Sequence, residues 1–176
     1  ADAPKALSGS LSTTPAELQS TVVLPLNDLD ACNRILNAHK DELAALILEP
    51  VQRGFLVAEP DFLKGVRETT TALDSLLIFD EIMSGFRMEK LGAAQTIVGV
   101  EPDLMALGKI IGGGFPCGAF LGTKATMDAV NPVTRAPNER VFHGGTFNGH
   151  PTVLAAGLAT LDVLEEPGTY PSLNRI

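Results

Sequence analysis

Short, continuously apolar runs alternate along this chain with stretches of helical periodicity. Four such runs cover residues 43–48, 76–79, 104–107 and 119–122. Runs of this length are typical of strands, and the continuous run at residues 43–48, which ends at Glu49-Pro50, fits a strand buried on both faces of a parallel sheet. Apolar residues recur at helical spacing over residues 28–39, 62–73 and 152–164. The sequence therefore predicts an α/β fold, a mostly parallel sheet flanked by helices.

Composition excludes several classes of function. The 176 residues carry a net charge of −8 with no basic cluster, which argues against a nucleic-acid or anionic-membrane partner. No apolar run approaches the roughly 20 residues of a membrane span, and the first residues lack the pattern of a signal peptide. Cys32 and Cys117 form no CxxC pair, and His143 and His150 lack a third ligand at metal spacing. We therefore expect a cytoplasmic protein without a metal site.

A carboxylate and a lysine mark the ends of two neighbouring apolar runs. Asp80 and Glu81 follow residues 76–79, and Lys109 follows residues 104–107 at the start of a glycine-rich stretch. A lysine can bind an aldehyde cofactor covalently, and a carboxylate can keep a pyridine nitrogen protonated, so this pair favours pyridoxal phosphate (PLP). The alternatives are that Lys109 is an ordinary surface lysine and that Asp80 and Glu81 only cap the following turn.

Four motifs give the chain a family resemblance. They are LILEPV at residues 46–51, LLIFDEIMSGFR at 76–87, PDLMALGKIIGGGFPCGAF at 102–120 and HGGTFNGHP at 143–151. In this order they resemble the class III, fold-type I, PLP-dependent aminotransferases. The nearest subgroup is that of glutamate-1-semialdehyde 2,1-aminomutase and related transaminases. The resemblance implies the three-layer large domain of that fold, with PLP as the cofactor.

The resemblance also assigns roles to individual residues. Lys109 would form the Schiff base with PLP and move a proton during the reaction, and Asp80 would contact the ring nitrogen. Ile82 matches the position that packs on the ring face. Met83 occupies a position that is methionine in aminomutase-type members, although most methionines only fill a core.

Two further segments match positions near the cofactor or the substrate. Gly145 and Thr146 lie in the turn that, by resemblance, reaches the cofactor phosphate of the neighbouring subunit, which implies a homodimer. Glycine N–H groups and a hydroxyl suit an oxyanion, but an ordinary tight turn would carry the same residues. Glu49 matches a glutamate on the substrate side of the site, and structural support of the strand end is an equal interpretation.

The extent of the match sets the expected organisation. Residues 1–21 are expected to be a loop or extended segment, residues 22–166 the central and later part of a PLP-binding large domain, and residues 167–176 the start of a connection to a small domain. The family usually has much longer chains, so the resemblance implies a partial domain.

Three functions stay open on the sequence. The first is amino transfer between an amino acid or amine and a keto acid or aldehyde. The second is the intramolecular amino shift of an aminomutase, which residues 88–91 and the turn GTFNGHP make less typical. The third is a truncated, non-catalytic assembly partner.

Overall fold

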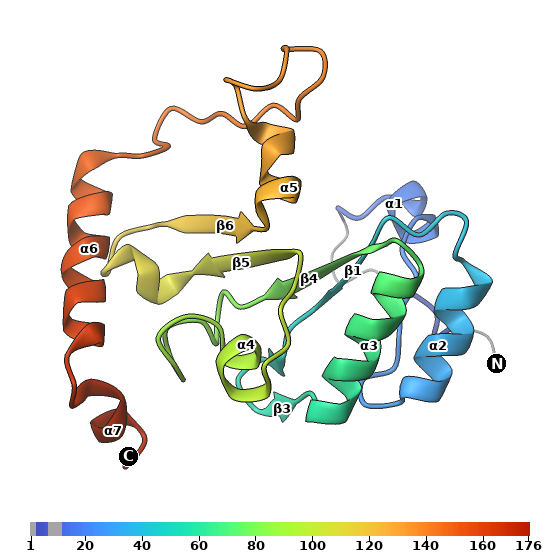
Figure 1. Cartoon of the computed structure of the whole chain (residues 1–176), viewed down its shortest axis with the longest axis horizontal. Helices are drawn as coiled ribbons and strands as arrows, with labels where there is room; N and C mark the ends of the chain where they lie inside the picture. Colours follow the sequence, from blue (N-terminus) through green and yellow to red (C-terminus); the bar gives the residue numbers. More distant parts are fainter. Residues whose placement is uncertain (1–2, 7–11) are drawn as a thin grey trace.

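The computed structural model describes residues 3–6 and 12–176 and contains a four-stranded sheet (Figure 1). The strand order is β1-β4-β5-β6. The strands are β1 (Ala45–Leu48), β4 (Leu76–Asp80), β5 (Leu104–Gly108) and β6 (Gly118–Gly122). β1, β4 and β5 are parallel, and β6 is antiparallel to β5. A separate hairpin is formed by β2 (Val51–Gln52) and β3 (Leu56–Val57).

Helices connect and flank these strands. They are α1 (Pro15–Gln19), α2 (Leu29–Ala38), α3 (Pro60–Ala72), α4 (Ala93–Val98), α5 (Lys124–Met127), α6 (Pro151–Glu165) and α7 (Thr169–Leu173), with 3-10 turns η1 (Lys109–Gly112) and η2 (Asp128–Val130). The three longest, α2, α3 and α6, confirm the helices predicted from periodicity. Asp28 caps α2, because its Oδ1 accepts the N–H of Ala31 at 2.9 Å.

The main core lies between α2, α3 and one face of the sheet. Leu77 and Phe79 of β4 and Val66 of α3 are fully buried there. Figure 1 shows α2 and α3 together on that side of the sheet. On the opposite face the side chains of Ile47 and Leu76 remain 65% and 38% exposed. The expectation that residues 43–48 are buried on both faces is therefore wrong for Ile47, because no described segment covers it.

The segment expected to be a loop, residues 1–21, contains the short helix α1. Thr14 and Glu17 form a capping box: the Thr14 N–H donates to Glu17 Oε2 at 2.7 Å, and the Glu17 N–H donates to Thr14 Oγ1 at 3.4 Å. Residues 1–2 and 7–11 of this segment lie outside the described residues. None of the described helices is both long and apolar enough to cross a lipid bilayer.

The two cysteines are both free thiols with contrasting surroundings. Cys32 is fully buried in the main core, and this burial, with a smaller contribution from nearby Asp28, raises the pKa of its thiol to about 11. Cys117 is only half-buried.

We therefore expect a thiol reagent at pH 8 to modify Cys117 while Cys32 stays unmodified until the protein unfolds. At that pH about one Cys32 thiol in a thousand is ionised, and only the thiolate reacts. Peptide mapping after treatment with Ellman's reagent, with and without denaturant, measures this order. Modification of Cys32 at the rate of Cys117 in the native protein would contradict it.

Candidate active site

Asp80 and Lys109 lie at the same edge of the sheet. Asp80 is the last residue of β4 and pairs in register with Ala106 of β5, and Lys109 follows directly after β5. The carboxyl ends of β1, β4 and β5 point toward the side of the molecule where η1 and α6 lie (Figure 1). Because β4 and β5 are parallel neighbours, their carboxyl ends bring the two residues together. Ligands of α/β sheets usually bind at this edge.

Ile82 connects the two strand ends. A side chain added to Gly108 would place its Cβ 3.0 Å from Ile82 Cγ2, so the Ile82 side chain lies against the backbone just before Lys109. The Ile82 N–H donates to Asp80 Oδ1 at 3.1 Å. Asp80, Ile82 and Lys109 thus form one continuous group at the strand ends.

Both charged groups of this pair lack a partner of their own. Within the described residues, Asp80 Oδ2 accepts no hydrogen bond, and the Lys109 ammonium has no ion pair or hydrogen bond. The backbone of Lys109 is left-handed, with φ at +49°. This conformation costs a residue with a side chain about 1 kcal/mol or more, and such strain is concentrated at functional sites.

Glu49 and Met83 lie beside this group, at the β2–β3 turn. Leu48 pairs with Phe79, so Glu49 follows β1 at the level where Asp80 ends β4. Glu49 Oε2 accepts the N–H of Arg53 at 3.1 Å, which gives the structural interpretation of Glu49 an observed contact. Met83 Sδ lies 3.5 Å from the position that a Cβ on Gly54 would take, in the same turn.

Gly145 and Thr146 lie in an exposed segment before α6, across the sheet from Asp80. The register aligns Asp80 with Ala106 and Ala106 with Phe120 of β6, so these three residues share one face. The Phe120 ring meets the His143 ring edge-on at a centroid distance of 5.0 Å. This contact places the glycine-rich segment on the face of the sheet that carries Asp80. The segment lies at β6, and β5 separates β6 from the β4 strand that ends at Asp80.

Two residues of this region have contacts that the sequence pattern does not predict. His143, which lacks the spacing of a metal ligand, packs on Phe120. Glu81 is fully buried next to Asp80. Its carboxylate accepts the N–H groups of Ala93 and Ala94 at the start of α4, beyond the turn that directly follows Asp80 and Glu81.

α6 crosses η1 at a glycine, directly beside the strand end that carries Lys109. A Cβ on Gly157 would come within 2.6 Å of the Ile111 carbonyl oxygen. Gly157 is buried, and Leu161 of the same helix packs with Ile111 around Leu107. The position of η1 therefore depends on a close approach that only glycine allows.

We expect Gly157→Ala to lower the free energy of unfolding by about 1–3 kcal/mol, the usual cost of an overpacked site. Helix propensity alone predicts the opposite, a gain of about 1 kcal/mol. Gly168→Ala is the matched control, because a Cβ there meets nothing within 4 Å. Denaturant unfolding of both variants measures the difference, and a stabilised Gly157→Ala would contradict this close packing.

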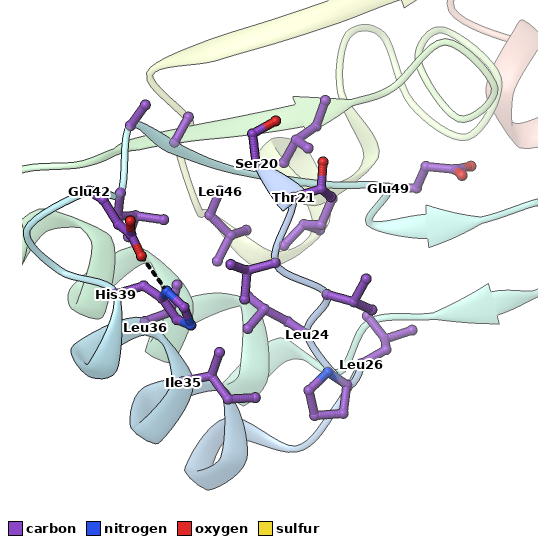
Figure 2. A pocket seen from close by; sticks show the side chains of 18 of the residues that line it. Ser20, Thr21, Leu24, Leu26, Ile35, Leu36, His39, Glu42, Leu46 and Glu49 are labelled. Carbon is purple, nitrogen blue, oxygen red and sulfur yellow. Dashed lines mark hydrogen bonds and ion pairs between the residues drawn. The ribbon is translucent and has the colours of Figure 1, made fainter. Parts of the chain in front are cut away.

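Two pockets of the described residues lie away from Asp80 and Lys109. The first, of about 660 Å³, lies between residues 19–26, α2 and β1. Figure 2 shows Leu24, Leu36 and Leu46 pointing into it, with the contact between His39 and Glu42 on its wall. The second, of about 790 Å³, lies between β6 and α6. Neither Asp80 nor Lys109 is among the residues that line these two pockets.

The chain is similar to proteins of known family and structure. The family model described as class III aminotransferase matches residues 7–176. An omega-transaminase from Sphaerobacter thermophilus is 45% identical with a TM-score of 0.86, and the match covers 92% of this chain and 36% of that one.

Two further solved structures are similar over comparable lengths. A β-phenylalanine aminotransferase from Variovorax paradoxus is 35% identical with a TM-score of 0.74, covering 86% of this chain and 34% of that one. A transaminase with PLP bound is 31% identical with a TM-score of 0.80, covering 89% and 37%. The chain thus spans little more than a third of the length of these proteins, as a partial domain would.

Proposed function

Because the chain belongs to the class III aminotransferase family, we propose that it supplies the PLP-binding centre of an aminotransferase. The observation that carries this proposal is the placement of Asp80 and Lys109 at adjacent strand ends, where Asp80 Oδ2 and Lys109 Nζ have no hydrogen bond or ion pair within the described residues. The left-handed backbone of Lys109 supports it, because such strain is concentrated at functional sites.

The residues at these strand ends suit PLP. Gly108 carries no side chain where Ile82 approaches, and the apolar Ile82 side chain beside a lysine and a carboxylate would suit a flat, charged ring that carries an aldehyde. Bound PLP supplies an aldehyde that combines with amines and a protonated ring that accepts electrons when a neighbouring C–H bond breaks.

Each residue then has a defined part. Lys109 Nζ would hold the aldehyde of bound PLP covalently and, once a donor amine took its place, would be free to move a proton. Asp80 Oδ2 would keep the ring nitrogen protonated, because an opposite charge nearby stabilises the charged form. Ile82 would border the cofactor, and so would Met83, whose Sδ lies near Gly54 of the β2–β3 turn. Glu49 supports that turn through the Arg53 N–H.

Amino transfer between two substrates is favoured over an internal amino shift. Two of the similar proteins are named an omega-transaminase and a β-phenylalanine aminotransferase, and both names refer to an amino group away from the usual α-position. We therefore propose an amine or β-amino acid as the donor and a keto acid or aldehyde as the acceptor. A labelled single substrate checks this, because an aminomutase converts it alone and a transaminase requires an acceptor.

A homodimer is part of the proposal. Thr146 and Gly145 are exposed, and the contact between His143 and Phe120 places their segment beside β6, with β5 between β6 and the β4 strand that carries Asp80. A hydroxyl and glycine N–H groups placed there suit the phosphate of a cofactor in the neighbouring subunit. The two free thiols are compatible with our expectation of a cytoplasmic location.

Borohydride reduction of the natural protein tests the proposal. Reduction fixes PLP to the amine that holds it, so mass spectrometry of the digest is expected to find a pyridoxyl group on Lys109. Lys124, an exposed lysine at the start of α5, serves as the internal control. Unmodified Lys109 in protein supplied with PLP would refute the proposal and favour the non-catalytic assembly partner.

A further inference from the structure

Glu81 is a fully buried carboxylate directly after Asp80. Its side chain is 0% exposed, whereas Asp80 is half-buried. The Glu81 N–H donates to the Ala106 carbonyl at 2.9 Å and so extends the ladder between β4 and β5 by one residue. Because successive side chains of an extended chain point to opposite faces, Glu81 points into the core beneath the face that carries Asp80.

The Glu81 carboxylate joins both ends of the loop between β4 and α4. It accepts the Ser84 hydroxyl near the start of the loop and the N–H groups of Ala93 and Ala94, at 3.0 and 3.1 Å, at its end. A buried carboxylate is costly unless its oxygens are hydrogen-bonded, and three donors meet that need here. The loop of residues 81–92 is thus closed around one side chain.

The loop of residues 81–92 also contains a residue with a strained, left-handed backbone. Phe86 is buried with φ at +58°, an unfavourable conformation for a bulky side chain. Its N–H donates to Leu91 O at 2.8 Å, and the Tyr170 hydroxyl donates to the carbonyls of Phe86 at 3.0 Å and Glu89 at 2.9 Å. Such strain persists only where the surroundings fix the backbone, so the loop is held rigidly.

We infer that Glu81 is a positioning residue for the cofactor site. It acts through the loop: Ile82 follows it directly, and the Ile82 N–H is the donor to Asp80 Oδ1. Loss of the bonds to Ser84, Ala93 and Ala94 would free residues 81–83 and with them the orientation of the Asp80 carboxylate and the Ile82 side chain. This inference rests on the proposed function of Asp80 and Ile82 as cofactor contacts.

The test compares Glu81→Gln, Glu81→Asp and Ser84→Ala with the control Glu89→Gln. Glu89 lies in the same loop, and its carboxylate has no hydrogen bond or ion pair within the described residues. Each variant of the natural protein is stripped of PLP and titrated with PLP. The readouts are the dissociation constant, the visible absorption maximum of the bound cofactor, and the unfolding midpoint of the cofactor-free protein.

Glu81→Gln is expected to weaken PLP binding about tenfold, the lower end of the effect of outer-shell partners in metal sites, and to shift the absorption maximum. Ser84→Ala and Glu81→Asp should change both readouts in the same direction by less, and Glu89→Gln should change neither. If Glu81→Gln does not fold, the two milder variants decide.

One result would overturn the inference: lower unfolding midpoints with an unchanged dissociation constant and absorption maximum in the Glu81 and Ser84 variants. Glu81 would then only cap α4. Failure of the proposed function is distinct, because the unsubstituted protein would then neither bind PLP nor give a pyridoxyl group on Lys109.

Discussion

Replacing Lys109 with alanine is expected to reduce amino transfer by about 10³-fold or more, since positioned proton transfer alone contributes about 10²–10⁴-fold. The variant lacks the amine that we propose to hold the cofactor aldehyde and to move the donor proton. Lys109→Arg should be similarly inactive, because a guanidinium keeps its proton and cannot combine with an aldehyde. Single-turnover conversion of a donor amine by the PLP-loaded protein measures the effect.

The matched control for this substitution is Lys124→Ala, which removes an exposed lysine at the start of α5. It should retain full activity. A Lys109→Ala variant that converts the donor at more than a tenth of the unsubstituted rate would exclude Lys109 as the proton carrier.

The backbone of Lys109 gives a second, independent readout. At φ +49° alanine is as strained as lysine, whereas glycine is not. In the absence of cofactor, Lys109→Gly is expected to be about 1 kcal/mol more stable than Lys109→Ala. Denaturant unfolding of the two variants measures this, and the reverse order would show that the left-handed conformation is not adopted.

The parts of the fold that could be predicted from the sequence are those with a long or continuous apolar pattern. Continuous apolar runs predict the strands β1, β4, β5 and β6. Helical spacing of apolar residues predicts the three longest helices, α2, α3 and α6. The hairpin β2–β3, with two residues in each strand, and the six-residue α4 are too short to show one. The exposure of Ile47 depends on which segments cover the sheet, and its own run of residues does not encode this.

The candidate site divides in the same way. Strand order alone places Asp80 and Lys109 at one edge, so their proximity could be predicted. The left-handed backbone of Lys109 could not, because it is imposed by the turn into η1 and lysine gives no signal for it. Nor could the role of Glu81, since its partners Ala93 and Ala94 follow 12 and 13 residues later in an element that the periodicity did not reveal.

Asp80→Asn is the second substitution with a large expected effect. It keeps the shape of the side chain, and its amide oxygen can still accept the Ile82 N–H that Asp80 Oδ1 accepts at 3.1 Å. It removes the negative charge that, in the proposed site, would hold the proton on the cofactor ring. Two unit charges about 4 Å apart at an effective dielectric constant of about 20 interact by about 4 kcal/mol. At about 1.4 kcal/mol per factor of ten, we expect amino transfer to fall by about 10³-fold.

The charge is tested separately from the fold by including Asp162→Asn, an exposed position on α6 where the same change should leave activity and stability unaltered. Asp80→Asn should keep the unfolding midpoint within a few degrees of the unsubstituted protein, because the half-buried Asp80 carboxylate has no ion pair within the described residues. Two quantities are measured on the same samples. One is the rate at which the donor amine is converted, and the other is the visible absorption spectrum of the bound cofactor. An Asp80→Asn variant that retains more than a tenth of the rate would mean that another group protonates the ring, and the role of the β4 strand end would then be structural.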